Sequence, residues 1–264
     1  NSIFDFEIVS DPKDISENKK IVSVVSLGNA KTKIKVATKE SGEVAFNAIK
    51  YAYDLSIENK NNAIITAPIS KTALKLAGIN FAGHTEIFAN FCNVKNFAMM
   101  FVSEKMKASI ATIHIPIKDV DKKITIENLK SRINVLLNSL RNDFGIANPK
   151  IALLGLNPHA GENGNIGVKE IEVINKIINN KNIFGAFPAD GFFAAKKFLD
   201  YDLIFGMYHD QVLIPFKMLF SKTGVNFTAG LPIIRTSPDH GTAYDIAGKN
   251  IADESSTLAA FKVA

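Results

Sequence analysis

Short apolar runs rich in β-branched residues alternate with amphipathic stretches along most of the chain. Such runs predict strands covered on both faces, because those strands lack the usual alternation of apolar and polar residues. We predict strands at residues 21–27, 63–67, 97–102, 109–114, 150–156 and 202–207. Strand–helix alternation of this kind predicts an α/β fold with a parallel or mixed sheet.

The stretches between these runs have helical periodicity, and we predict helices at residues 42–58, 71–76, 85–91, 125–142, 168–180, 192–199 and 254–263. The longest central stretch has apolar residues at helical spacing, which predicts one face packed on the core: Ile126, Leu129, Ile133, Leu136, Leu137 and Leu140. The first forty residues differ, with a polar loop, "DPKDISENKK", and short β-like runs. We find no flexible linker that would separate independent domains.

Composition favours a globular protein with a sizeable core, since 47% of the 264 residues are hydrophobic and 22% are charged. No apolar run approaches the roughly 18–20 residues that a membrane helix needs. The N-terminal residues lack the basic start and apolar core of a secretion signal. A single cysteine, Cys92, excludes an internal disulfide and suits a reducing compartment, so we expect a cytoplasmic protein.

The net charge is +5, but the lysines are scattered and not interleaved with aromatic residues. This pattern favours a mild attraction for small anions over nucleic-acid binding. We expect neither a nucleic acid nor a membrane as partner.

Three of the five histidines each lie at the end of a buried-strand pattern, where a loop begins: His114 in "SIATIHIP", His159 in "IALLGLNPH" and His209 in "DLIFGMYHD". Ligands of open α/β sheets bind outside the carboxyl ends of the strands. Three imidazoles meeting there would form a divalent-metal site with an open position. The alternative for each histidine is a hydrogen-bonded loop residue. The H-E-x-x-H pattern of zincin proteases is absent from the sequence.

Gly161, Gly164 and Gly167 form a G-x-x-G-x-x-G loop before a helical pattern. Backbone amides at a helix N-terminus favour an anion such as phosphate, so the loop is a candidate anion site. It matches neither the dinucleotide fingerprint nor a Walker loop. The alternative is a plain turn.

Lys217, Asn226 and Arg235 recur nine residues apart in the C-terminal third. Lys217 lies in an apolar stretch, where a cation usually needs a partner. A lysine and an arginine together suit a phosphate ester, although ordinary surface ion pairing is the alternative. In "GHTE", His84 and Thr85 either cap a helix or face a ligand.

The ordered set "GHTE", "GLNPHAGENGNIG", "FPAD", "YHDQ" and "VNFTAGLPIIRTSPDHGTAYDIAG" resembles the 4-hydroxythreonine-4-phosphate dehydrogenases of vitamin B6 biosynthesis, from about Ala63 to the C-terminus. The resemblance implies an isocitrate/isopropylmalate-dehydrogenase-like α/β fold, with two interleaved subdomains flanking a cleft in one unit over residues 1–264. It also implies a homodimer with shared active sites. The family usually opens with a G-D-P-x-G-I-G-P-E segment that this sequence lacks, so we expect the N-terminal part of the family fold to be missing here.

The resemblance also implies roles for individual residues. The metal ligands would be His114, His159 and His209, and the substrate contacts would be His84, Thr85, Lys217, Asn226 and Arg235. "HGTAYDIAG" is similar to the loop that holds the adenosine of NAD in the wider superfamily, which makes Gly241 and Asp245 candidate cofactor residues. The residue that takes the hydroxyl proton stays open, and the candidates are Asp190, Asp210 and a residue of the missing N-terminal loop. Two positions depart from the family pattern, with Gly191 after "PAD" and Val212 after "YHDQ".

The implied reaction is the oxidation of 4-phosphohydroxy-L-threonine by NAD or NADP at a divalent metal, which would be zinc, magnesium or cobalt. The product, 2-amino-3-oxo-4-phosphobutanoate, decarboxylates to 3-amino-2-oxopropyl phosphate during pyridoxal phosphate biosynthesis. Three alternatives stay open: a sister dehydrogenase acting on a phosphorylated threonate or erythronate, a phosphate acyltransferase, and a non-catalytic binding protein with a structural metal.

Overall fold

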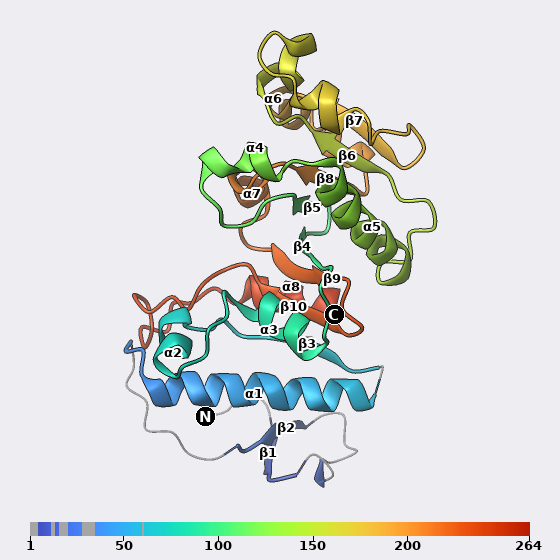
Figure 1. Cartoon of the computed structure of the whole chain (residues 1–264). Helices are drawn as coiled ribbons and strands as arrows, with labels where there is room; N and C mark the ends of the chain where they lie inside the picture. Colours follow the sequence, from blue (N-terminus) through green and yellow to red (C-terminus); the bar gives the residue numbers. More distant parts are fainter. Residues whose placement is uncertain (1–4, 12–13, 16–20, 28–34, 60) are drawn as a thin grey trace.

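The computed structural model of the chain describes residues 5–11, 14–15, 21–27, 35–59 and 61–264 (Figure 1). The described residues form one eight-stranded sheet and a separate pair of parallel strands. The pair joins β1 (Phe6–Val9) to β2 (Val22–Val25). In Figure 1 the pair is drawn beyond α1 (Lys39–Glu58), at the end of the molecule opposite β7.

The large sheet has the order β3-β10-β9-β4-β5-β8-β6-β7. The pairs β10–β9, β9–β4 and β4–β5 are antiparallel, and all the other neighbours are parallel. The mixed α/β sheet expected from the sequence is therefore confirmed. The strands, in chain order, are β3 (Ala63–Ile65), β4 (Ala98–Val102), β5 (Lys107–Ile110), β6 (Ile151–Leu154), β7 (Ile183–Phe187), β8 (Leu203–Gly206), β9 (Val225–Ala229) and β10 (Ile234–Pro238).

Four helices cover the β3 end of the sheet. The helix α1 begins at a capping box formed by Thr38 and Ser41, and it packs with α2 (Lys71–Leu76) and α3 (His84–Phe91). The core between these helices and β3 includes Ile49, Ile64, Leu74, Ile87 and Phe88. A C-terminal helix, α8 (Ser255–Val263), lies against β10 and β9.

Two helices cover opposite faces of the other half of the sheet, α5 (Ile126–Asn142) and α7 (His209–Phe220). Neighbouring strand residues point to opposite faces, so Phe205 packs in the core beneath α5 while Ile204 packs in the core beneath α7. The predicted apolar face of α5 is confirmed, with Leu129, Ile133, Leu136 and Leu140 buried.

The predicted helix at 168–180 is one π-helical turn, η4 (Glu170–Ile174), and the predicted helix at 192–199 is divided between α6 (Ala189–Ala194) and η5 (Lys197–Asp200). Two further short helices, η2 (Ile117–Asp119) and α4 (Val120–Lys123), precede α5. The predicted strand at 109–114 ends at Ile110. The sequence did not predict β1, β7, α7, β9 or β10.

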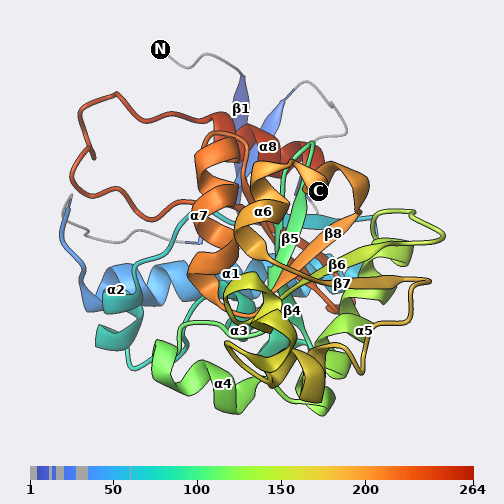
Figure 2. The ribbon, with the colours of Figure 1, turned by 90° about the horizontal axis from the view of Figure 1, so that it is seen from above.

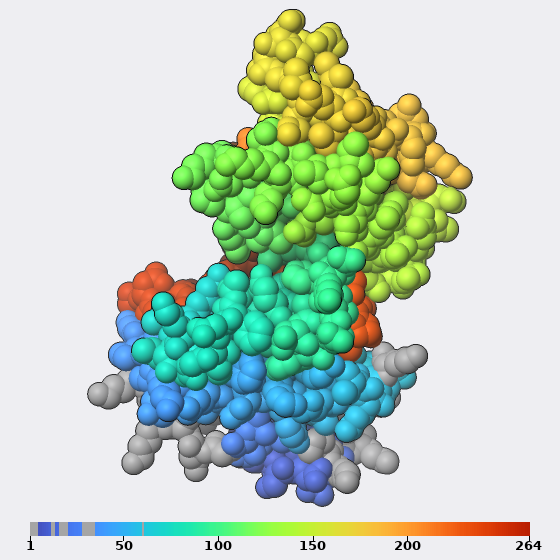
Figure 3. Space-filling view, in the orientation of Figure 1, coloured from blue at the N-terminus to red at the C-terminus, as the bar shows by residue number. Residues whose placement is uncertain are grey.

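The molecule has two halves joined by the continuous sheet, with β4 at the junction (Figure 1). Seen along the perpendicular direction, α7 and α5 lie on opposite sides of the strands (Figure 2). The surface is hollowed between the two halves (Figure 3). None of the described helices is both long and apolar enough to cross a bilayer.

Candidate active site

A cavity of about 380 Å³ lies between the two halves, where α3, α7, β9 and β10 meet. Its lining includes all five residues that the sequence suggested as substrate contacts, His84, Thr85, Lys217, Asn226 and Arg235, together with His114 and His209. These residues are spread over 152 positions of the chain. The fold therefore brings the C-terminal cations, the "GHTE" segment and two of the three histidines to one place.

Arg235 is the largest buried polar side chain of the cavity, with 2% of its surface exposed. Its guanidinium donates hydrogen bonds to Thr66 Oγ1 at 2.7 Å and to Thr228 Oγ1 at 3.4 Å. Burial lowers the arginine pKa to about 10 while the charge of Glu86 opposes this shift, so the group stays charged at neutral pH. A buried, fixed guanidinium of this kind favours binding of an anion.

His84 is the first residue of α3, and its N-cap is Gly83 without any side-chain cap. Burial and the neighbouring charge of Arg235 lower the His84 pKa to about 3, so the imidazole is neutral at physiological pH. Thr85 does not cap the helix, and its hydroxyl lies 3.4 Å from that of Thr228. His84 and Thr85 therefore both face the cavity, and both are among its lining residues.

Lys217 and Asp239 form an ion pair at 3.4 Å across the edge of the cavity. The lysine on α7 therefore has the partner that its apolar surroundings led us to expect. Burial raises the pKa of Asp239 above its ordinary value, and the charge of Lys217 acts in the opposite direction.

Three buried polar atoms at this cavity have no hydrogen-bond partner among the described residues: His84 Nε2, Asn226 Oδ1 and Arg235 Nε. Buried polar atoms are nearly always satisfied in folded proteins, since leaving one unpaired costs about 1–3 kcal/mol. All three belong to predicted substrate residues. A polar ligand in the cavity would supply the missing partners.

The histidine pair next to this cavity has a geometry suited to a metal ion. His114 follows β5 and His209 follows β8, two neighbouring parallel strands, and their ring centroids are 5.7 Å apart. Two imidazoles bound to one tetrahedral ion would have centroids roughly 5 Å apart. His209 Nδ1 lies 2.7 Å from a carboxylate oxygen of Asp210, which leaves its Nε2 free for a ligand. The spacing of the two rings is therefore close to that of two ligands of one divalent ion.

His159 also follows a strand of the same parallel set, β6, but it is exposed and does not line this cavity. It lies in the turn η3 (Pro158–Gly164) with a left-handed backbone, φ 53°. Asn157 fixes this turn by donating to both carboxylate oxygens of Glu170 at 2.8 and 3.0 Å. Across the described ranges of this single chain, no three potential ligands gather around one metal position.

The glycine loop after β6 is filled by the carboxylate of Glu170, which is 2% exposed. Gly161 has φ 81°, and a Cβ there would lie 2.6 Å from Glu170 Oε2. A Cβ on Gly167 would overlap the Asn157 amide. The glycines therefore allow a tight turn around a buried anion of the chain itself, which is the plain-turn alternative and disfavours phosphate at this loop.

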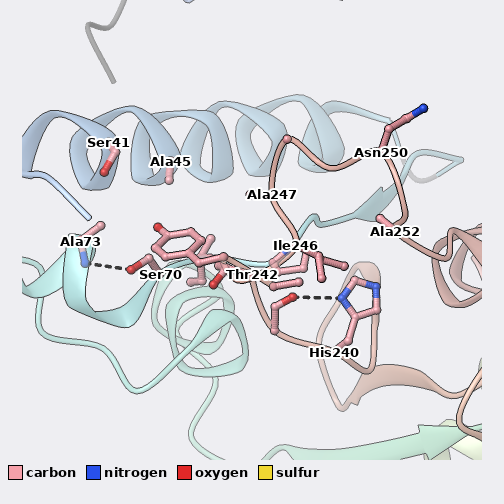
Figure 4. Close-up of a pocket in the computed structure, with 16 residues that line it drawn as sticks. Ser41, Ala45, Ser70, Ala73, His240, Thr242, Ile246, Ala247, Asn250 and Ala252 are labelled. Atoms are coloured by element: carbon pink, nitrogen blue, oxygen red, sulfur yellow. Dashed lines mark hydrogen bonds between the residues drawn. The ribbon is translucent and has the colours of Figure 1, made fainter. Parts of the chain in front are cut away.

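A second cavity of about 660 Å³ lies between α1, α2 and the loop that follows β10 (Figure 4). Ser41, Ala45 and Ser70 line it on the helix side. On the loop side it is lined by His240, Gly241, Thr242, Ala243, Tyr244, Ile246, Ala247, Gly248, Asn250 and Ala252. Gly241 lines both cavities, so the two adjoin. Asp245 is exposed on the same loop and does not line this cavity.

The two candidate proton acceptors, Asp190 on α6 and Asp210 on α7, are exposed and line neither of these cavities. Sequence reasoning missed three charged residues that do line the first cavity, Lys71, Glu86 and Asp239. Glu86 and Asp239 lie inside motifs that drew attention for other residues, "GHTE" and "SPDHG". Lys71 begins α2 and has no comparable signal.

A cavity that is lined by cations, lies at the strand ends of an α/β sheet and adjoins a larger cavity is typical of enzymes that act on small anionic molecules. The family model described as "Pyridoxal phosphate biosynthetic protein PdxA" matches residues 3–264. A 4-hydroxythreonine-4-phosphate dehydrogenase of Sulfurihydrogenibium sp. (strain YO3AOP1) is 44% identical over 231 residues, which cover 86% of this chain and 72% of that protein. The chain therefore belongs to the PdxA family of pyridoxal phosphate biosynthesis.

A second relative at the same level of identity has a different name. A putative D-threonate 4-phosphate dehydrogenase of Oceanobacillus iheyensis is 44% identical over 226 residues, 83% of this chain and 68% of that protein. Both relatives are dehydrogenases, and this chain is an oxidoreductase. Membership of this family decides against the phosphate acyltransferase and the non-catalytic binding protein.

Solved structures agree with the fold class. A 4-hydroxythreonine-4-phosphate dehydrogenase from Klebsiella pneumoniae has a TM-score of 0.86 at 34% identity, covering 98% of this chain and 81% of that one. This match confirms the dehydrogenase fold that the sequence motifs implied. A branched-chain phosphotransacylase from Enterococcus faecalis, with a TM-score of 0.51 at 14% identity, shares the fold alone.

Proposed function

We propose that this protein oxidises 4-phosphohydroxy-L-threonine with NAD or NADP to 2-amino-3-oxo-4-phosphobutanoate, which decarboxylates to 3-amino-2-oxopropyl phosphate. The observation that carries this proposal is the single cavity that gathers His84, Asn226 and Arg235, each with an unpartnered buried polar atom, beside a pair of histidines. A ligand with several polar groups would supply hydrogen-bond partners for these atoms.

The phosphate and carboxylate of this substrate are bound by Arg235, Lys217 and Asn226. Arg235 supplies a fixed, desolvated guanidinium, and Lys217 adds a flexible cation at the more exposed edge. Neutral His84 contributes a hydrogen bond without adding a further positive charge. A cavity with this composition attracts the substrate by charge and orients it by hydrogen bonds.

His114 and His209 hold the divalent metal, with Asp210 fixing the ring of His209. We propose that the third imidazole is His159 of the partner subunit, so that the homodimer completes the site. Two observations support this proposal. His159 is exposed on η3, and among the described residues of one chain no third ligand joins His114 and His209. When bound, the metal, which would be zinc, magnesium or cobalt, acidifies the substrate alcohol and polarises the ketone formed from it.

The second cavity would hold the nicotinamide cofactor, which would supply the hydride acceptor. The loop from His240 to Ala252 supplies one wall, and Gly241 lies where the two cavities adjoin. Asp245, exposed on the same loop, is proposed to contact the cofactor from the rim. The two halves of the molecule act as subdomains that flank this cleft, and we propose a cytoplasmic location for the enzyme.

A second candidate function is supported by the relative named as a putative D-threonate 4-phosphate dehydrogenase. D-threonate 4-phosphate carries the same phosphate, carboxylate and C3 hydroxyl, with a hydroxyl in place of the amine. The same cavity residues would serve both substrates, so a direct comparison of turnover is needed to choose between them.

The test is NADH formation, followed by absorbance, with each of the two phosphorylated substrates before and after treatment with a chelator. We expect turnover of 4-phosphohydroxy-L-threonine that the chelator abolishes and that added zinc, magnesium or cobalt restores. Turnover of only D-threonate 4-phosphate would transfer the assignment to the second candidate. Turnover that the chelator leaves unchanged would contradict the metal site.

A further inference from the structure

The cavity contains two carboxylates, and only one of them has a cationic partner. Lys71, Lys217 and Arg235 provide positive charge, while Glu86 and Asp239 provide negative charge. Asp239 pairs with Lys217 and its side chain is only 15% exposed. Within the part of the chain that the structure describes, Glu86 has no hydrogen bond and no ion pair at contact distance. Glu86 is therefore the carboxylate available to a ligand.

Glu86 lines the same cavity as the predicted substrate residues. It is in the first turn of α3, next to His84 and Thr85, and it is half-buried. Its charge acts to raise the pKa of both Arg235 and His114, against the effect of burial. It therefore shares one cavity with the buried cation and with the histidine pair.

The proposed substrate has one group that none of the cationic side chains can bind, its α-ammonium. The carbon that carries this group adjoins the carbon that carries the reacting hydroxyl, so the ammonium lies close to the histidine pair when the hydroxyl does. A cation in a cavity rich in lysine and arginine requires an anionic acceptor. We propose that Glu86 accepts a charge-assisted hydrogen bond from the substrate ammonium and so selects the amino acid over the corresponding hydroxy acid.

This inference rests on the proposed function, and it is tested by binding, without NAD and therefore without turnover. Dissociation constants of 4-phosphohydroxy-L-threonine and D-threonate 4-phosphate are measured by titration calorimetry on the zinc-loaded protein and its Glu86→Gln variant. We expect Glu86→Gln to weaken binding of the amino ligand about 10- to 100-fold, the usual range for a hydrogen bond to a charged group. Binding of the hydroxy ligand should change less than about threefold.

The matched control is Glu127→Gln, since Glu127 is also an acidic residue in the first turn of a helix but is exposed on α5. It should leave both dissociation constants unchanged. Equal weakening of the two ligands by Glu86→Gln would mean that Glu86 only balances the charge of Arg235, and it would overturn the inference. So would unchanged binding of both ligands.

A wrong substrate assignment gives a different result, because it changes which ligands the unmodified protein binds. Unmodified protein that binds the hydroxy ligand alone, or neither ligand, overturns the substrate assignment and the role of Glu86 with it. Thermal melting checks that Glu86→Gln is folded. If it is not, Glu86→Asp retains the charge on a shorter side chain and should weaken the amino ligand more than the hydroxy ligand, whereas equal effects overturn the inference.

Discussion

The imidazole rings of His114 and His209 lie 5.7 Å apart because the strands before them, β5 and β8, are hydrogen-bonded neighbours. His114 is exposed and His209 is half-buried, and their proximity is a consequence of the sheet order. The pair supplies two ligands, whereas a catalytic metal site usually has three protein ligands. The origin of the third ligand is therefore the most useful feature of the site to test.

Mixed dimers test whether the metal site is shared. His159→Ala and His209→Ala chains should each be inactive and poor in metal as pure dimers. When they are co-expressed, a mixed dimer has one site with His114, His209 and His159 of the partner subunit all intact. About a quarter of the wild-type sites should then be restored in a random mixture, because half the dimers are mixed and each has one complete site.

The readouts are metal content by atomic emission and NADH formation, measured on mixtures purified with two different affinity tags. If all three ligands came from the same chain, every mixed dimer would have two broken sites, and no metal would be regained. Melting temperatures of the two variants must stay close to that of the unmodified protein for the result to count.

Asp210 should matter through His209. Its carboxylate lies 2.7 Å from His209 Nδ1 and fixes the orientation of the ring. Replacing such an orienting group typically costs 10- to 100-fold in metal affinity. We expect Asp210→Asn to weaken zinc binding by roughly this factor in a chelator competition assay, with Asp190→Asn as the exposed acidic comparison. Equal metal affinities of the two variants would contradict the role of Asp210.

Arg235→Lys should be a severe substitution despite the conserved charge. Lysine cannot donate to Thr66 and Thr228 and still present a planar pair of donors to an anion. We expect kcat/KM to fall roughly 10- to 100-fold, mainly through KM, since a hydrogen bond to a charged group is worth about 1.5–3 kcal/mol. Arg141→Lys, at the last turn of α5, is the control. An unchanged KM in Arg235→Lys would exclude it from substrate binding.

Acid should destabilise the ligand-free protein partly through His84. Its pKa is about 3 in the folded state and near 6.5 when unfolded, so the unfolded chain takes up a proton that the folded chain does not. The stability contributed by neutral His84 is present above pH 6.5 and is lost as the pH falls toward 3. Between pH 7 and 4.5 this costs about 2 kcal/mol.

Urea unfolding at the two pH values measures this loss. His84→Gln, which has no titrating group, should lose about 2 kcal/mol less than the unmodified protein over the same interval. The subtraction removes the contributions of other groups, such as Asp239. The same pH dependence in both proteins would mean that His84 becomes protonated without cost and lies in a wetter site.

The sequence predicted those strands whose apolar runs are not interrupted by polar residues. Six predicted strands and the apolar face of α5 appear at the predicted positions, within a few residues at their ends. It missed β9 and β10, whose residues Asn226, Thr228 and Arg235 face inward and interrupt the apolar pattern. Two of these residues, Asn226 and Arg235, line the cavity, so residues of the site itself concealed the strands that carry them. Pro215 had a similar effect in α7, since proline usually argues against a helix interior.

The sequence placed the three histidines at the ends of strands, but it could give neither the order of those strands in the sheet nor the distances between the rings. The position of His159 depends on the turn that Asn157 and Glu170 hold, a side-chain interaction between residues 13 apart. Glu86 was overlooked because its importance lies in having no partner in the folded chain, and a sequence does not show which charges are paired.

The eight-stranded sheet runs without interruption from one wall of the cavity to the other, since β9, which carries Asn226, is hydrogen-bonded along its whole length to β4. Enzymes whose lobes are connected by single-stranded hinges can rotate them freely. Here an opening of the cleft must instead be accommodated by twisting of β4 and β5, while their backbone hydrogen bonds are retained. Any change in the separation of the two walls would therefore bend a hydrogen-bonded ladder of five residue pairs, and the stiffness of that ladder resists it.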